Sequence, residues 1–151
     1  LQAEESGRLQ EVERSVAAPI IFEAEKKALQ VADEAKRKLS EHLYVMAQSM
    51  LPQVRQDNYG NIFTGLVDEL PPLEWETVTV NALDEDLARS FFPGAEIITD
   101  STLSGGFITS GDNDRYRVIN TLEHRLEKVW PFVMPTFLKE VVGEKDAASA
   151  P

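Results

Sequence analysis

The sequence predicts an α+β protein in which a long N-terminal helix precedes a C-terminal α/β head. Residues 1–51 are rich in Glu, Ala, Lys and Leu, which is the composition of a long helix. Residues 52–143 instead alternate between strand and helix patterns, which predicts a globular head. Residues 144–151 are small and polar, so we expect a disordered tail there.

The N-terminal helix carries a stripe of small and apolar residues that recurs about every eleven positions, a period typical of right-handed coiled coils. A helix of ~50 residues would be ~75 Å long, which is more than a head of ~100 residues can cover. We therefore expect a partner helix to cover the stripe, although an amphipathic helix packed on its own head is the alternative. Pro19 is expected to kink or restart the helix. The expected partner-helix seam consists of Val31, Ala35, Leu39, Leu43, Met46 and Met50.

Periodicity and turn residues predict a four-stranded mixed sheet in the head, built from a β-α-β unit and a β-hairpin and flanked by helices. The first two strands should be parallel, because a helical crossover connects them. The last two should form a hairpin around the turn Gly111–Asp114. The predicted helices are 57–70, 87–92 and 121 onward, with bends at Pro131 and Pro135, and the predicted strands are 75–80, 96–99, 106–110 and 115–120.

Several motifs suggest chemistry, but a structural interpretation fits each of them better. Gly105-Gly106 leads into a strand without the Lys-Ser/Thr of a phosphate-binding loop, so a close backbone approach is expected. Asp112-Asn113-Asp114 are adjacent and cannot converge on one calcium ion, whereas they suit a tight turn. The acidic residues 84–86 are expected to be a solvated helix start.

The last predicted helix begins with a capping sequence and continues into an aromatic segment. Asn120 or Thr121 is the expected cap, with Glu123 reaching back to the backbone as in a capping box. The aromatic segment supplies a large apolar area close to two prolines, so we expect it to form a head interface or the core that supports one. Its residues are Trp130, Phe132, Phe137 and Leu138.

Composition excludes several classes of function. A net charge of −11 repels phosphate backbones, so no nucleic-acid partner is expected. The absence of cysteine excludes disulfides and thiolate chemistry and fits a reducing cytoplasm. His42 and His124 have no metal-ligand spacing, and no apolar run approaches a membrane span. We therefore predict no catalytic residue, metal site or cofactor, and a small acidic enzyme is a disfavoured alternative.

The stretch SGGFITSGDNDRYRVINTLEHRLEKVWPFVMP, residues 104–135, resembles the C-terminal signature of the E subunit of V-type and archaeal-type (A/V) ATPases. The similarity extends over about residues 75–143. The chain departs from the family in its shorter N-terminal helix, in Pro19 and in Pro131. The matching positions are Ser104-Gly105-Gly106, Gly111, Asn120-Thr121-Leu122-Glu123, Arg125-Leu126 and Pro135.

This resemblance implies a non-catalytic peripheral-stalk, or stator, protein that lies in the cytoplasm and reaches the membrane only through its complex. The long helix would pair with the G subunit in a right-handed coiled coil, and the isolated chain could self-associate through it. The head would hold the catalytic headpiece, chiefly the B subunit and also the A subunit, against rotor torque during ATP-coupled proton or sodium transport. A flagellar or type III export ATPase regulator shares the helix-plus-head plan and is the alternative.

Overall fold

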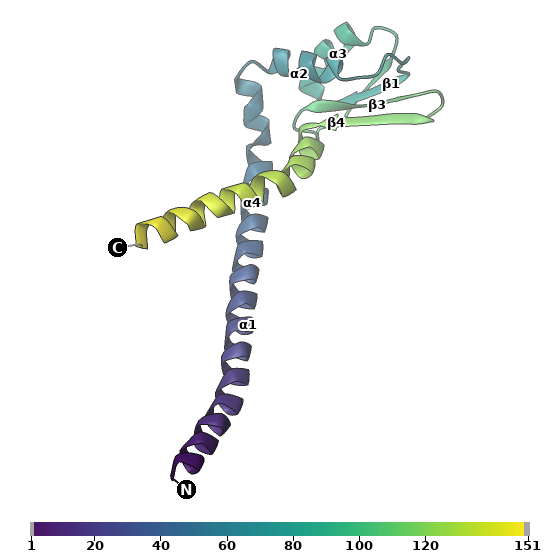
Figure 1. Cartoon of the computed structure of the whole chain (residues 1–151). Helices are drawn as coiled ribbons and strands as arrows, with labels where there is room; N and C mark the ends of the chain where they lie inside the picture. Colours follow the sequence, from purple (N-terminus) through teal and green to yellow (C-terminus); the bar gives the residue numbers. More distant parts are fainter. Residues whose placement is uncertain (1, 150–151) are drawn as a thin grey trace. The chain divides into compact units, whose positions relative to one another are not determined.

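The computed structural model of the chain describes residues 2–149, and it describes side chains for residues 2–141. The order of elements confirms the predicted α+β class (Figure 1). The helices are α1 (Gln2–Met50), α2 (Tyr59–Asp68), α3 (Glu85–Phe91) and α4 (Leu122–Ser149), with short 3-10 helices η1 (Leu51–Gln56) and η2 (Ala82–Asp84). The strands are β1 (Thr77–Val80), β2 (Glu96–Thr99), β3 (Gly106–Gly111) and β4 (Tyr116–Thr121).

The described chain divides between His42 and Leu43 into two compact units. The first unit is a stretch of α1, and the second holds the end of α1 together with the whole head. Helix α4 continues to Ser149, into the segment that the sequence assigned to a disordered tail. Residues 150 and 151 of that tail lie outside the described residues. The division at residues 51 and 143 stays a prediction.

Helix α1 forms because Ala, Glu, Lys and Leu dominate its sequence and have high helix propensity. Ion pairs one turn apart support it, with Arg37 lying 2.6 Å from Glu41 and Lys38 lying 3.5 Å from Glu34. Pro19 lies inside α1 without dividing it, although its missing N–H removes one backbone hydrogen bond. The expected restart at this proline does not occur.

The sheet has the strand order β2-β1-β3-β4. Strand β1 pairs in parallel with β2 and antiparallel with β3, and β3 pairs antiparallel with β4. The predicted β-α-β unit and hairpin are both confirmed by this pairing. The two supersecondary units join along the β1–β3 pair, where Val80 lies opposite Phe107.

Helices α2 and α3 cover one face of the sheet, where the core lies (Figure 1). Val78 and Val80 point into this face because alternate residues of a strand share one side. Phe63 of α2 and Phe107 of β3 pack edge to face, with ring centroids 5.4 Å apart. The buried core consists of Phe63, Leu66, Val78, Val80, Ala88, Phe92 and Phe107.

Element boundaries shift from the prediction where local contacts prevail over periodicity. The first strand begins at Thr77 rather than Trp75, whose ring packs instead on Tyr116 at 5.4 Å. Helix α3 begins at Glu85, before the predicted start at residue 87. Asn58 is the N-cap residue of α2, but its backbone is left-handed with φ 57° and its side chain makes no cap hydrogen bond.

The turn between β3 and β4 adopts the left-handed backbone that its residues tolerate. Asp112, Asn113 and Asp114 have φ values of 51°, 53° and 61°. Asn and Asp accept this conformation more readily than other residues with a Cβ atom. The expectation of a tight hairpin turn in this segment is therefore confirmed.

The start of α4 differs in part from the predicted capping box. Thr121, one of the two expected caps, accepts a hydrogen bond from the backbone N–H of His124 at 3.2 Å. Glu123 does not reach back along its own helix, because its Oε1 accepts the backbone N–H of Ser104 at 2.5 Å. Pro131 and Pro135 both lie inside α4 without ending it.

Candidate functional site: exposed apolar faces and a buried polar cluster

The predicted seam residues of α1 lie on a helix that has no buried residue among those described. Val31 is 69% exposed, and Leu39, Met46 and Met50 are also exposed. Leu43 is half-buried. Removing apolar side chains from water lowers the free energy, so this face is suited to binding another apolar surface. Which residues contact a partner stays a prediction.

Further large apolar side chains are exposed on α1 outside the predicted seam. An eleven-residue pattern does not single them out, because several lie beside the stripe rather than on it. Their exposure widens the apolar area that a partner could cover. These residues are Val12, Val16, Phe22, Leu29 and Val45.

The predicted C-terminal residues divide into exposed and partly buried groups on α4. Phe132 is 78% exposed and Phe137 is also exposed. Trp130 is half-buried and packs edge to face on Tyr44 of α1 at 5.2 Å, and Leu138 is half-buried. Core contact in this part of α4 also comes from Met134, which the sequence analysis did not select and which is 5% exposed.

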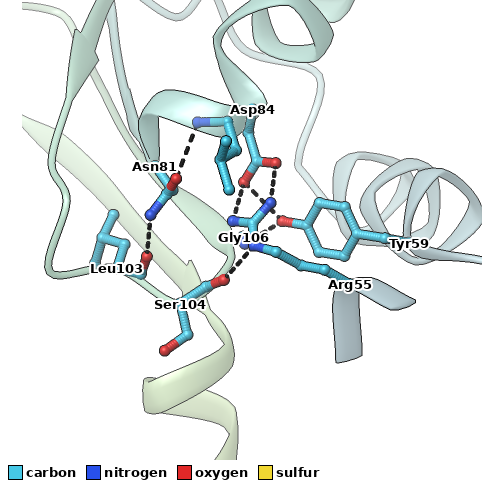
Figure 2. Close-up of polar contacts among 8 residues, drawn as sticks. Arg55, Tyr59, Asn81, Asp84, Leu103, Ser104 and Gly106 are labelled. Atoms are coloured by element: carbon cyan, nitrogen blue, oxygen red, sulfur yellow. Dashed lines mark hydrogen bonds and ion pairs between the residues drawn. The ribbon is translucent and has the colours of Figure 1, made fainter. Parts of the chain in front are cut away.

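A buried polar cluster joins η1 to the head (Figure 2). Arg55 donates from its two terminal nitrogens to the carboxylate of Asp84 at 2.5 and 2.7 Å, and from Nε to the carbonyl of Ser104 at 2.8 Å. Asp84 is only 2% exposed, so the pair is shielded from solvent. The hydrogen bonds to Asp84 raise the pKa of Arg55, which therefore stays charged.

Tyr59 extends the cluster into α2. Its hydroxyl donates to Asp84 at 2.8 Å and accepts the backbone N–H of Gly106 at 2.9 Å (Figure 2). The guanidinium of Arg55 also lies 4.6 Å from the centre of the Tyr59 ring, which is a cation–π distance. Burial, together with the hydrogen bond to Asp84, raises the pKa of Tyr59 to about 12. The phenol therefore stays neutral at physiological pH.

The paired glycines lie directly beside this cluster. A Cβ atom at Gly105 would stand 2.7 Å from Leu122 and 2.9 Å from the hydroxyl of Tyr59. Gly106 has φ +78°, and a Cβ there would stand 2.2 Å from the carbonyl oxygen of Asn120. The expected close backbone approach is confirmed, and it lets Tyr59 reach the start of β3.

The sequence analysis missed all three side chains of the cluster, Arg55, Tyr59 and Asp84. Asp84 was interpreted as part of a solvated helix start, and this was wrong because the structure buries it against Arg55. Arg55 was not selected at all. No local pattern connects two residues 29 positions apart. The only signal was Asn81, whose side chain caps η2 by accepting the N–H of Leu83 and thus places Asp84 at the end of a tight turn.

Other residues of the C-terminal motif also serve packing. The amide of Asn120 donates to the carbonyl of Leu66 at 3.0 Å and accepts from Nε of Arg125 at 2.7 Å. Arg125 also pairs with Glu69 at the end of α2. Asn120 and Arg125 therefore attach α2 to the β4–α4 junction.

The clearest features of the described residues are exposed apolar surfaces on α1 and α4. Within residues 2–149, no group of three or more His, Asp or Glu side chains is placed to hold a metal ion. In the same part of the chain, no helix combines the length and apolarity of a membrane crossing. The shielded Arg55–Asp84 pair neutralises its own charge. A long helix with exposed apolar residues and a head closed by internal polar contacts define a helix-plus-head protein that presents apolar surface.

Comparison with known proteins narrows this class to one family. No family model matches the chain. The chain is 38% identical over 125 residues to the V-type ATP synthase E subunit of Geotalea uraniireducens (strain Rf4), a match that covers 83% of this chain and 67% of that relative. The chain belongs to the family of V-type ATP synthase E subunits. This relationship confirms the resemblance seen in the C-terminal motif.

Proposed function

We propose that this chain is a non-catalytic peripheral-stalk protein that holds the catalytic headpiece of a rotary V/A-type ATPase against rotor torque. ATP hydrolysis or synthesis turns a central rotor, and the ring of catalytic subunits would turn with it unless it were held. The observation that carries the proposal is the exposed apolar face of α1 on a member of the E-subunit family. A tether needs binding surfaces and rigid elements rather than a reaction centre.

Helix α1 pairs with a helix of the G subunit in this proposal. Small residues such as Ala28 and Ala35 permit close approach of a second helix, and Leu39 and Met46 supply apolar contact area. Burying one such large side chain contributes ~1.5–3 kcal/mol, so a seam of several residues supports a stable complex. The eleven-residue rhythm favours right-handed winding of the pair.

The head binds the catalytic headpiece, chiefly the B subunit and also the A subunit. Its candidate contact residues are Phe132 and Phe137 on α4, because both expose aromatic surface. Val129 and Val133 add exposed aliphatic surface on the same helix. Exposed aromatic residues are frequent anchors of protein interfaces. Trp130 and Leu138 support this surface from partly buried positions.

The complex would place this chain in the cytoplasm, peripheral to the membrane. Its contribution to proton or sodium transport is mechanical, since an untethered headpiece lets rotor torque dissipate as rotation of the whole catalytic ring. The acidic surface implied by the net charge of −11 does not suit direct adsorption to anionic lipid. Contact with the membrane sector therefore runs through the other subunits.

Co-expression with the G subunit tests the proposal directly. The expected result is a stable heterodimer that captures the A and B subunits of the headpiece in a pull-down. A Phe132→Asp variant should keep the G subunit and lose much of the headpiece. Failure of the wild-type heterodimer to retain any part of the headpiece would contradict the proposed role.

A further inference from the structure

We propose that Arg55, Asp84 and Tyr59 form a latch that fixes η1, the segment directly after α1, to the head. The latch is the set of hydrogen bonds that these three side chains make with one another and with the backbone of Ser104 and Gly106 (Figure 2). It spans η1, η2, α2 and the start of β3. Its role is to keep the end of α1 in one orientation on the head.

The segment η1 has few other anchors. None of its residues is buried, and its N-cap residue Met50 makes no side-chain cap hydrogen bond. Leu51 and Val54 are half-buried and contribute some apolar contact. Arg55 is therefore the side chain that joins η1 to two separate segments of the head at once, η2 through Asp84 and the start of β3 through Ser104.

The chemistry of the latch favours one geometry. A guanidinium is a planar fork, and its paired bonds to a carboxylate fix both distance and angle. The Arg55 side chain is 16% exposed and that of Asp84 is 2% exposed, so salt screens the pair weakly. Tyr59 adds a third connection, because its hydroxyl bridges Asp84 and the N–H of Gly106.

The buried position also makes the latch sensitive to the loss of one member. Removing Arg55 takes the opposite charge away from the buried carboxylate of Asp84, which keeps its hydrogen bond from the neutral Tyr59 hydroxyl. The core face of the sheet is formed by other residues, including Phe63, Val78 and Phe107. The head core should therefore persist while η1 loosens. This separation is the measurable consequence of a latch.

The functional meaning of the latch rests on the proposed stalk role, since a tether transmits torque only if its helix and head are rigidly joined. The test uses the full chain alone, so its failure can be distinguished from failure of the stalk role. The chain has no cysteine, so pairs of spin labels can be attached at introduced cysteines without a background signal. Gln48 and Ser101 are exposed and suit this purpose.

The experiment compares Arg55→Met with Arg89→Met. Arg89 makes an exposed ion pair with Glu85 at 2.6 Å on α3, so its loss removes a comparable charge from the same head without touching the latch. Arg55→Met should broaden the Gln48–Ser101 distance distribution measured by pulsed electron resonance. It should also speed amide exchange in residues 51–59 by about tenfold or more while β1 and β3 stay protected. Arg89→Met should change neither measurement.

A second variant keeps the test decisive if Arg55→Met disturbs folding. The double variant Arg55→Met/Asp84→Leu removes both charges of the buried pair together and should fold. It should still show the broad distribution, because two apolar side chains lack directional bonds. Normal folding of both variants with an unchanged narrow distribution would overturn the latch. Loss of protection in β1 and β3 in both variants would also overturn it, since Arg55 would then support the core itself.

Discussion

Gly106 lies so close to Asn120 that a Cβ atom on it would stand 2.2 Å from the carbonyl oxygen of Asn120. Its φ of +78° is also a conformation that residues with a Cβ adopt only with strain. Gly106→Ala should therefore lower the free energy of unfolding by about 2–4 kcal/mol, from backbone strain and the clash together. Chemical denaturation of the two proteins measures this difference.

Gly65 provides the matched control for that substitution. It lies in α2, and an added Cβ would have no heavy atom within 4 Å. Gly65→Ala should raise the free energy of unfolding by ~0.5–1 kcal/mol, because alanine loses less backbone entropy in a helix. Equal changes in the free energy of unfolding for the two substitutions would show that the close approach at Gly106 does not determine the cost of an added Cβ atom there.

Tyr59 should make stability depend on pH in the alkaline range. Its pKa is raised from 10.0 to about 12 in the folded chain, so between these values the folded state holds a proton that the unfolded state has released. The stabilisation is fully present below pH 10 and is lost as pH rises toward 12. Denaturation midpoints at several pH values should fall more steeply in the wild type than in Tyr59→Phe across this window. Parallel curves would contradict the raised pKa.

The protein should be more stable with glycine than with a β-branched residue at position 113 of the β3–β4 turn. With φ 53° the backbone is left-handed, which costs most other residues about 1–2 kcal/mol relative to glycine. Asn113→Val should lower the thermal midpoint, whereas Asn113→Gly should leave it unchanged or raise it slightly. Calorimetry checks both variants. A valine variant as stable as the wild type would show that the turn relaxes to another conformation.

Two residues of α4 should separate binding from folding. Phe132 is 78% exposed, so Phe132→Ala should change the free energy of unfolding by less than ~0.5 kcal/mol. Met134 is 5% exposed, and Met134→Ala should cost about 2–5 kcal/mol. In the proposed complex the first change should weaken headpiece binding and the second should not do so at temperatures where the head stays folded. The reverse pattern would place Phe132 in the core.

The elements of the head follow from local patterns. The alternation in Thr77–Val80 places Val78 and Val80 on one face, and the helical crossover before Glu96–Thr99 requires parallel pairing. The glycine and left-handed residues of the Gly111–Asp114 turn define the hairpin. Each of these signals lies within a few residues of the element that it predicts.

The polar cluster could not be predicted in the same way. Arg55 and Asp84 are far apart in sequence, and an aspartate near a helix start is usually solvated. Only the three-dimensional approach of η1 to η2 reveals that the carboxylate is buried. Similarly, Glu123 looked like one half of a capping box, but it contacts Ser104 across the chain. Hydrophobic periodicity predicts helices and strands, but it does not indicate which polar groups far apart in the sequence will pair.

The most direct test of the proposed stalk role is the binding of the G subunit to a Leu39→Asp/Leu43→Asp variant. Charge in the middle of the apolar face should abolish the heterodimer on a sizing column, while near-ultraviolet circular dichroism shows an intact head. Gln30→Asp/Gln48→Asp is the matched control, because both residues lie nine positions from Leu39, about two and a half turns away on the opposite side of α1. This control should keep the heterodimer. An undiminished heterodimer with the Leu39→Asp/Leu43→Asp variant would contradict the stalk role.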